Sequence, residues 1–418
     1  MRKTSSSLLP NTIRRRIAKG LMALPAAILL SGIGMSASAA DVNTTGLAVT
    51  DDTVTVGILH SLTGTMAISE TGSQEAEKLA ISQINAMGGI LGRQIKIIQE
   101  DGASDWPTFA EKSRKLLVQD KVAAVFGAYT SASRKAVLPV FEKENGLLYY
   151  PTYYEGLEQS KNVIYAGQEA TQQILSGLDW VAKEKEAKTF YLIGSDYLWP
   201  RTAMKIARKH IENELGGTVV GEDYKPLGNT QFGSVINKIR LKKPDVIYAA
   251  VVGGSNVAWF KQLKAAGITA KKQTLMTISV TEDDVLGIGG ENLEGFYSVM
   301  KYFQSQDNPN NKAFVTAFKE MWGEDSVIGD GTQAAYLGPW LWKAAVERAG
   351  SFDIDKVVAE SEKGDIELTT APEGYVKLHK NHHLWSKTRV GEWSKDGQAT
   401  VVYTSELIEP NPFPSGYQ

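Results

Sequence analysis

Short segments rich in hydroxyl groups, aromatic rings and glycine recur along the chain, each directly after an apolar run of strand length. They are residues 61–65, 129–134, 151–155, 195–200, 253–255 and 279–282. These segments are poor in Lys and His, so a phosphate group would find few cationic partners in them. Hydroxyl groups between aromatic walls suit a ligand that forms hydrogen bonds. The segments therefore favour a binding site for a small, neutral, polar molecule.

Thr130 and Ser131 stand at a predicted helix start. The first backbone N–H groups of a helix have no acceptor within the helix, so they can hold a carbonyl oxygen of a ligand. Ser and Thr in such places also serve as plain helix N-caps, and for either residue alone that interpretation stays open. The recurrence of the pattern in several loops favours a ligand site.

Motifs for catalysis or cofactor binding are weak. The nucleophile elbow Gly-x-Ser-x-Gly and the phosphate loop Gly-x-x-x-x-Gly-Lys are absent from the sequence. His379, His382 and His383 have a spacing that resembles a metal site, but they lie in a polar tail and favour a solvated or structural hairpin. The glycines of residues 287–290 predict a turn. We expect no enzyme activity, no metal and no cofactor.

These loops must be positioned by alternating strands and helices. The expected strands are residues 54–60, 94–100, 122–127, 147–150, 190–194, 219–224, 245–252 and 273–278. The expected helices are residues 71–87, a segment capped by Asp105, and residues 131–145, 171–185, 201–215, 231–241 and 255–266. Two such series predict an α/β fold of two doubly wound, Rossmann-like lobes. Ligands bind such sheets outside the carboxyl ends of the strands, where the polar loops lie.

The alternation of strands and helices ends after an apolar stretch at residues 296–303. Helices are expected at residues 311–322 and 333–349, followed by a polar, turn-rich tail. Residues 391–393 and 401–404 predict an antiparallel hairpin in this tail. Three further prolines close the chain and predict an extended strap or a frayed end.

The N-terminal residues 1–40 predict a secretory signal peptide. They hold six Lys or Arg and no acid, then a short apolar stretch and an Ala-Ser-Ala-Ala end. The apolar stretch is too short for a membrane anchor, which needs about 20 residues. Export through either the general or the twin-arginine route remains open.

Composition narrows the compartment and the partners. The chain has no Cys, so neither a disulfide framework nor a lipid-modified Cys is possible, and we expect a soluble protein free in the periplasm. Lys and Arg number 45 against 47 Asp and Glu, with no long run of one sign in the body. No nucleic-acid partner is therefore expected.

Several motifs carry a family resemblance. The opening VGIL-H-SLTG of residues 56–64 and the turn ILGR of residues 90–93 resemble type I periplasmic binding proteins of the leucine/isoleucine/valine group. Residues 127–137 (GAYTSASRKAV), 150–156 (YPTYYEG) and 194–201 (GSDYLWPR) are similar to the urea and short-amide branch of that group. Asn381, His382 and His383 add to this likeness, which covers residues 51–412.

The resemblance implies a domain order and a function. Lobe I would comprise residues 51–166 and 303–366, and lobe II residues 167–302 with the C-terminal strands and strap of residues 367–418. Three crossovers would form the hinge between them. The receptor would bind urea or a short amide between the lobes and deliver it to the permease and ATPase subunits of an ABC importer. A receptor for a branched-chain amino acid and a periplasmic sensor of amide or urea are the alternatives.

The resemblance also implies which residues bind the ligand. From lobe I they are Ser131, Tyr150 and Thr152, and from lobe II Tyr197, Gly253 and Glu282. Tyr129 and Trp199, from the same strand-end loops, complete the predicted set. Backbone N–H groups near Ser131 or Thr152 would hold the urea carbonyl, and hydroxyl oxygens would accept its N–H groups. Tyr197 and Trp199 would cover the planar face. For a branched-chain amino acid, Glu282 would instead bind the ammonium group.

Overall fold

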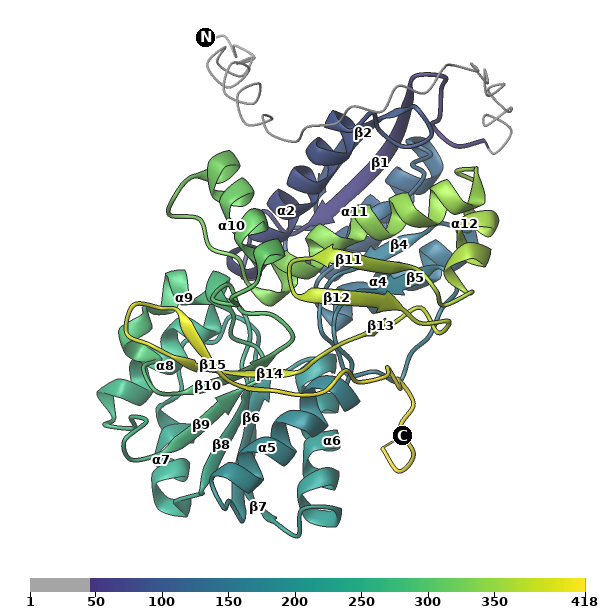
Figure 1. Cartoon of the computed structure of the whole chain (residues 1–418). Coiled ribbons are helices and arrows are strands. Elements are labelled where there is room, and N and C mark those ends of the chain that lie inside the picture. Colours follow the sequence, from purple (N-terminus) through teal and green to yellow (C-terminus); the bar gives the residue numbers. More distant parts are fainter. Residues whose placement is uncertain (1–45, 418) are drawn as a thin grey trace, which may run out of the picture. The chain divides into compact units, whose positions relative to one another are not determined.

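The computed structural model describes residues 46–417. The predicted signal peptide, residues 1–40, lies outside the described residues. Within the described part of the chain, every helix is too short or too polar to cross a membrane. Two sheets organise the described residues, and in Figure 1 they are the purple-to-blue strands β1–β5 and the teal strands β6–β10. We call the halves built on these sheets lobe I and lobe II.

The lobe I sheet has the order β2-β1-β3-β4-β5 and all its pairs are parallel. Its strands are β1 (Thr53–His60), β2 (Gln94–Asp101), β3 (Val125–Gly127), β4 (Leu148–Tyr150) and β5 (Val163–Tyr165). The central strands are almost wholly buried, which fits their runs of Val, Ile, Phe and Tyr. The order with β1 inside is that of a doubly wound sheet, which opens a crevice at the carboxyl ends of β1 and β3.

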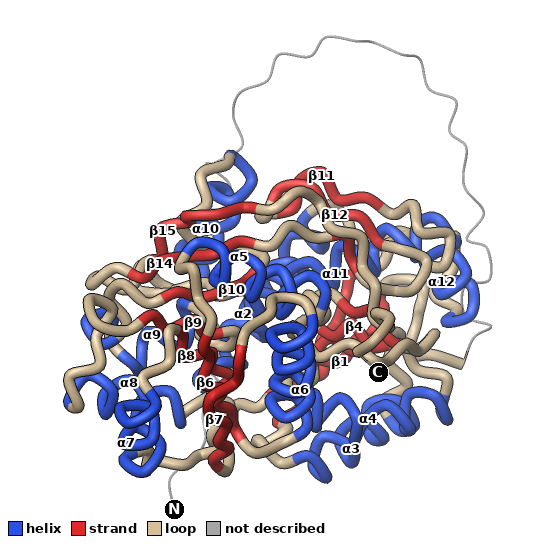
Figure 2. Tube along the Cα trace, turned by 90° about the horizontal axis from the view of Figure 1, so that it is seen from below, coloured by secondary structure: helices blue, strands red, loops and turns tan. Residues whose placement is uncertain are grey.

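The helices of lobe I cover this sheet or pack on the helices that cover it. They are α2 (Ala67–Ala86), α3 (Trp106–Arg114), α4 (Ser131–Glu144), α10 (Pro309–Trp322), α11 (Asp330–Ala349) and α12 (Ile354–Ser361). The helices α2 and α11 pack against each other, and α3 lies beside α4, as Figure 2 also shows. Asp105 caps α3 as predicted, because its Oδ2 accepts a hydrogen bond from the backbone N–H of Thr108 at 3.0 Å.

The lobe II sheet has the order β15-β14-β10-β9-β8-β6-β7. Its strands are β6 (Thr189–Ser195), β7 (Thr218–Lys225), β8 (Val246–Ala250), β9 (Thr274–Thr277), β10 (Tyr297–Met300), β14 (Arg389–Trp393) and β15 (Ala399–Thr404). The pairs from β7 to β10 are parallel, and β14 and β15 join as an antiparallel edge. The predicted C-terminal hairpin is thus confirmed and completes this sheet.

Helices of lobe II follow the predicted rhythm. They are α5 (Ser176–Glu184), α6 (Leu198–Asn213), α7 (Gly233–Lys242), α8 (Ser255–Ala265) and α9 (Glu282–Ile288). A single π-helical turn, Thr171–Leu175, precedes α5, so the predicted helix of residues 171–185 is two segments in the structure. The elements that were not predicted include β5, α9 and α12 (Ile354–Ser361), because each is short and has little periodicity of its own.

The chain passes between the lobes after β5, after β10 and before β14. The predicted boundary at residue 367 differs from the structure. The strands β11 (Glu367–Ala371), β12 (Gly374–Leu378) and β13 (Leu384–Trp385) form a separate sheet whose apolar side chains join the lobe I core. They belong to lobe I because Val376, Leu378 and Leu384 are buried there.

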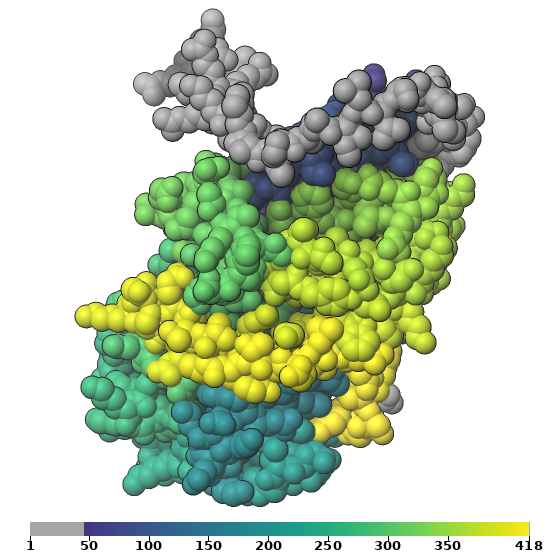
Figure 3. Space-filling model, viewed as in Figure 1, coloured from purple at the N-terminus to yellow at the C-terminus, as the bar shows by residue number. Residues whose placement is uncertain are grey.

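The residues after β15 form the predicted strap. In Figure 3 this yellow segment runs over the surface of the described chain. The Leu157 backbone N–H donates to the Pro412 carbonyl at 2.7 Å, and the Tyr417 hydroxyl lies 2.7 Å from His210 Nδ1. Because Leu157 belongs to lobe I and His210 to lobe II, the strap contacts both lobes.

Candidate functional site

A small cavity lies where the loops after β3, β4, β6 and β8 meet. It has a volume of about 10 Å³ and is lined by Tyr129, Thr130, Ser131, Thr152, Tyr153, Tyr197, Trp199 and Val252. A volume of this size is about what one water molecule needs. The first five lining residues come from lobe I and the last three from lobe II. The cavity is therefore enclosed by strand-end loops of both lobes, as the topology predicts.

The structure brings most of the predicted site residues together. Tyr129, Ser131, Thr152, Tyr197 and Trp199 all line the cavity. Among the lining residues, Thr130, Tyr153 and Val252 were not singled out by the sequence. The first two are neighbours of predicted residues in the quoted motifs, whereas Val252 precedes the predicted Gly253.

Ser131 is polarised by two buried charged groups behind it. Its hydroxyl donates to Glu155 Oε2 at 2.5 Å and accepts from Arg134 Nη1 at 3.1 Å. All three residues are buried, with Glu155 only 3% exposed. Because the hydroxyl proton is committed to the carboxylate, the remaining lone pair of Ser131 Oγ can only accept a hydrogen bond.

Arg134 lies at the centre of a buried ion cluster. Its Nη2 contacts Glu155 Oε1 at 3.0 Å and its Nε contacts Glu158 Oε1 at 2.8 Å. Burial alone would lower the pKa of Arg134, but Glu155 and Glu158 keep it above its usual value. The guanidinium also lies 4.8 Å from the ring centre of Tyr150 and 4.4 Å from that of Tyr154. Neither Arg134 nor Glu155 was predicted as part of the site, although both stand in the quoted motifs.

Tyr150 does not line the cavity, in contrast to the prediction. Its hydroxyl donates to the Tyr129 carbonyl at 2.6 Å, and the side chain is completely buried. Burial raises its pKa above the usual value. Tyr150 therefore supports the cavity wall through Tyr129, because the ring projects from β4 into the core of the lobe.

Two polar side-chain atoms of the lining are buried without a hydrogen-bond partner among the described residues. They are Thr152 Oγ1 and Trp199 Nε1. A buried polar atom without a partner costs about 1–3 kcal/mol, so a ligand group that pairs with either atom removes this cost. Thr152 Oγ1 can donate or accept a hydrogen bond, whereas Trp199 Nε1 can only donate one. Together with Ser131 they offer both kinds of hydrogen bond at one place.

Aromatic and backbone contacts close the site between the lobes. The ring of Trp106, at the start of α3, lies 6.3 Å from that of Tyr197. The Tyr153 ring lies 5.3 Å from that of Trp199. The Gly254 backbone N–H donates to the Thr65 carbonyl at 3.2 Å. Gly253 has a φ of 59°, and a Cβ there would lie 2.9 Å from that carbonyl oxygen, so this position requires glycine. Gly253 thus shapes the contact between the lobes beside the cavity and is absent from the lining.

Glu282 is also absent from the lining. Its Oε1 accepts the backbone N–H of Gln304, in the second crossover, at 2.8 Å. Burial, only partly offset by that hydrogen bond, raises its pKa to about 8. Glu282 opens α9, whose neighbours Asp283 and Asp284 accept hydrogen bonds from Thr332 and Ser69 of lobe I at 3.0 Å each. The acidic start of α9 therefore lies at the junction of the lobes.

The C-terminal histidines make structural contacts. His383 Nε2 lies 2.5 Å from the Tyr154 hydroxyl, and its ring stacks on Tyr165 with 4.3 Å between centres. Burial lowers the pKa of His383 to about 3, so it is neutral. His382 Nδ1 lies 3.1 Å from the Val163 carbonyl. Within residues 46–417 no group of three or more His, Asp or Glu is arranged to hold a metal ion.

Comparisons with known proteins agree with this architecture. The profile of a family described as "Periplasmic binding protein domain" matches residues 54–418. The leucine-, isoleucine-, valine-, threonine-, and alanine-binding protein of Pseudomonas aeruginosa is 25% identical over 357 residues, which cover 84% of this chain and 92% of that protein.

Two solved structures have the same fold. One is the solute binding protein of an ABC transporter from Rhodopseudomonas palustris with p-hydroxybenzoic acid, with a TM-score of 0.78, 24% identity and coverage of 88% of this chain and 100% of the other. The second is a branched-chain amino acid transporter substrate binding protein from Streptococcus pneumoniae with isoleucine. Its TM-score is 0.73 and its sequence identity is 21%. The match covers 86% of this chain and 100% of the other.

The family match spans both lobes and the cavity between them. Members of this family are substrate-binding receptors and not enzymes, in keeping with a site that has hydrogen-bonding groups and aromatic walls. The chain belongs to the family of periplasmic binding proteins, whose profile spans both lobes, and it is similar over most of its length to a leucine-, isoleucine- and valine-binding receptor.

Proposed function

We propose that this receptor binds urea, or a short amide of similar size, in the cavity between its lobes. It then delivers the ligand to the permease and ATPase subunits of an ABC importer. The predicted signal sequence supports a periplasmic location for this step. The proposal concerns the ligand, because the receptor role follows from the family.

The observation that carries the proposal is the uncharged lining. None of the residues that line the cavity is Asp, Glu, Lys, Arg or His. Behind the wall at Ser131, Arg134 and Glu155 are paired with each other at 3.0 Å. A buried ion in the ligand would stay without a partner, which is far more costly than an unpaired neutral group. A neutral ligand is therefore favoured.

The hydrogen-bonding groups match the pattern of urea. Urea has one carbonyl acceptor and four N–H donors on a planar frame. Ser131 Oγ can only accept, and Thr152 Oγ1 has no other described partner, so both suit the N–H groups. The indole N–H of Trp199 and the backbone N–H groups in the first turn of α4 suit the carbonyl. The rings of Tyr197 and Trp199 cover a planar ligand.

Ligand size limits the affinity. Four heavy atoms at a ceiling of about 1.5 kcal/mol each give about 6 kcal/mol, or a Kd of tens of micromolar. Because the cavity holds only about 10 Å³, a small ligand requires the least movement of its walls. Leucine or an aromatic acid would require the lobes to separate further.

A branched-chain amino acid is the alternative, supported by the names of the relatives. Such a ligand carries an ammonium group, for which Glu282 was the predicted partner. Glu282 instead accepts a hydrogen bond from the backbone of Gln304 and lies outside the lining. This arrangement favours urea over an amino acid.

Isothermal titration calorimetry on the mature protein tests the choice. Urea, acetamide, formamide, leucine and 4-hydroxybenzoate are titrated separately into the protein and into its Glu282→Gln variant. We expect heat from urea or an amide, none from the two charged ligands, and a change in urea Kd below about threefold in the variant. Binding of leucine that is lost in Glu282→Gln, without urea binding, would overturn the proposal.

A further inference from the structure

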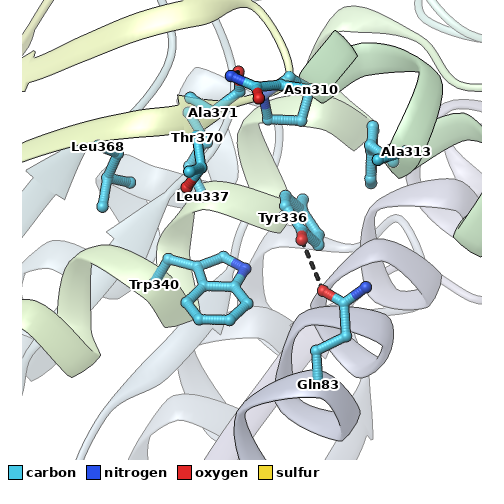
Figure 4. A pocket seen from close by; sticks show the side chains of 11 residues that line it. Gln83, Asn310, Ala313, Tyr336, Leu337, Trp340, Leu368, Thr370 and Ala371 are labelled. Carbon is cyan, nitrogen blue, oxygen red and sulfur yellow. Dashed lines mark hydrogen bonds between the residues drawn. The ribbon is translucent and has the colours of Figure 1, made fainter. Parts of the chain in front are cut away.

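A second cavity opens on lobe I, apart from the site between the lobes. Its volume is about 330 Å³, within the range of small-molecule sites. Residues of α2, α10, α11 and β11 line it, and Figure 4 shows their side chains facing a common space. It shares no lining residue with the cavity between the lobes.

Aromatic side chains form one continuous wall of this pocket. The rings of Phe314 and Tyr336 are 4.4 Å apart, and those of Tyr336 and Trp340 are 6.2 Å apart. Leu337 and Leu368 add apolar surface. Apolar walls of this kind gain free energy by covering the apolar body of a ligand.

A few polar groups interrupt the apolar wall. The Tyr336 hydroxyl donates to Gln83 Oε1 at 2.6 Å, so Gln83 presents its Nε2 as a donor. Trp340 Nε1 is buried beside the Tyr336 hydroxyl and makes no well-aligned hydrogen bond with any described residue. Both groups are donors, and Figure 4 shows Trp340 and Gln83 on two sides of the Tyr336 hydroxyl. A ligand that matches them has a hydrogen-bond acceptor.

The charge of the lining restricts the ligand further. None of the residues that line this pocket is Asp, Glu, Lys, Arg or His. Burial raises the pKa of Tyr336 to about 12, so its hydroxyl is neutral. A carboxylate ligand would have no cationic partner here and would lose its hydration.

We propose that this pocket is a second ligand site, for a neutral molecule with an aromatic or compact apolar body and one carbonyl oxygen. The body packs on Phe314, Tyr336 and Trp340. The carbonyl accepts hydrogen bonds from Trp340 Nε1 or Gln83 Nε2. The site is independent of the ligand that binds between the lobes.

Acetophenone and benzoate form a matched pair of probes, because they have the same number of heavy atoms and differ in charge. Each is titrated into 15N-labelled mature protein while the indole N–H signals of the Trp residues are recorded by NMR. The variant Trp340→Phe assigns one of these signals by its disappearance. We expect acetophenone to shift the Trp340 signal and leave the Trp199 signal unchanged, and benzoate to shift neither.

Two helix variants decide whether binding occurs in this pocket. Ala313 is exposed on α10 and lines the pocket, so Ala313→Trp fills it with little risk to the fold. Thr316 is exposed on the same helix outside the lining, and Thr316→Trp is the matched control. We expect Ala313→Trp to weaken acetophenone binding by about tenfold or more, and Thr316→Trp to change it less than about twofold.

The proposal has distinct points of failure. An unshifted Trp340 signal, or the same affinity in Ala313→Trp as in the wild type, would show that the pocket is not a ligand site. Equal binding of benzoate would refute the neutral ligand class. Urea titrations of the same variants are expected to be unchanged, so failure here leaves the site between the lobes untouched.

Discussion

The hydroxyl of Ser131 donates its proton to the carboxylate of Glu155 across 2.5 Å, which gives the cavity wall a defined polarity. Arg134 contacts both residues and holds the carboxylate in place. The hydroxyl oxygen facing the cavity is therefore an acceptor before any ligand arrives. A preoriented acceptor saves the cost of ordering it upon binding, and this matters most for a ligand of few atoms.

Thr152→Val is expected to separate binding from stability. The Thr152 hydroxyl oxygen is buried without a described partner, so its removal relieves a buried polar group. We expect the free energy of unfolding to stay constant or rise by about 1 kcal/mol, and urea binding to weaken by about tenfold. Guanidinium chloride is the denaturant for this measurement, because urea is the proposed ligand.

Thr130→Val is the control for this prediction. Thr130 lines the same cavity, but its Oγ1 accepts the backbone N–H of Ser133 at 3.0 Å and caps α4. Loss of the cap should lower the free energy of unfolding by about 1 kcal/mol. A loss of stability in Thr152→Val as large as in Thr130→Val would show that the Thr152 hydroxyl has a structural partner.

Arg134→Met is expected to destabilise the fold strongly. It leaves the buried carboxylates of Glu155 and Glu158 without their main partner, which costs about 3–5 kcal/mol. Arg208 is the matched control, because it also pairs with two carboxylates but has a side chain that is 36% exposed. Arg208→Met should cost less than about 1 kcal/mol. Both variants are unfolded with guanidinium chloride. Equal losses of unfolding free energy in Arg134→Met and Arg208→Met would show that burial does not strengthen the Arg134 ion pairs.

The contacts of His60 lead us to expect that the stability of the fold depends on pH. Its Nε2 lies 2.9 Å from Glu77 Oε1 and its Nδ1 lies 3.5 Å from Glu70 Oε2. Burial by itself lowers the pKa of His60, but the two carboxylates raise it to about 9 in the folded protein. The pKa of a His in the unfolded chain is 6.5. The contribution of protonated His60 to the free energy of unfolding is therefore complete below pH 6.5 and disappears as the pH rises through 9. From these pKa values it amounts to about 3 kcal/mol at most.

The variant His60→Gln isolates this contribution. The difference in unfolding free energy between wild type and variant should be largest near pH 6 and shrink steadily towards pH 9. The acids of α9 do not pair with His60, so their titration affects both proteins alike, whereas Glu77, whose pKa is raised by burial and lowered by His60, titrates as part of the pair. A difference that stays constant or grows with pH would show that His60 is not the charged partner of Glu70 and Glu77.

Trp106→Ala is expected to speed ligand release. Trp106 is 37% exposed and contacts the Tyr197 ring, which covers the cavity from the opposite lobe. Its loss should raise the dissociation rate of urea by about three- to tenfold and change the association rate little. Trp180→Ala is the control, since Trp180 contacts Tyr297 away from the cavity. Stopped-flow measurements on both variants check this, and equal rates would contradict a closing role for Trp106.

Local patterns in the sequence predicted the α/β architecture and the edge of each sheet where the site lies. Apolar runs such as that of β1 reveal strands because burial on both faces of a parallel sheet requires them. Alternation with helices then determines which loops meet. Asp105 was likewise predictable, because an N-cap acts on a backbone group three residues away.

The sequence alone assigned side-chain directions less well. Tyr150 and Glu282 stand at the predicted strand ends, but neither lines the cavity. Tyr150 supports the Tyr129 carbonyl, and Glu282 binds the backbone of the second crossover. The strands β11 to β13 pack on lobe I, although their polar sequence resembles neither lobe. The contacts of Tyr150, of Glu282 and of these strands are all made with segments that are far away along the chain.

The sequence by itself determined the two βα series, the strand-end loops and the uncharged, hydroxyl-rich chemistry of those loops. Only the tertiary structure decided that Glu155 orients Ser131, that Thr152 remains without a partner and that Trp106 meets Tyr197. The physical reason is range. Periodicity and capping act over a few residues, whereas the partner of a buried polar group is selected by packing between segments that are far apart along the chain.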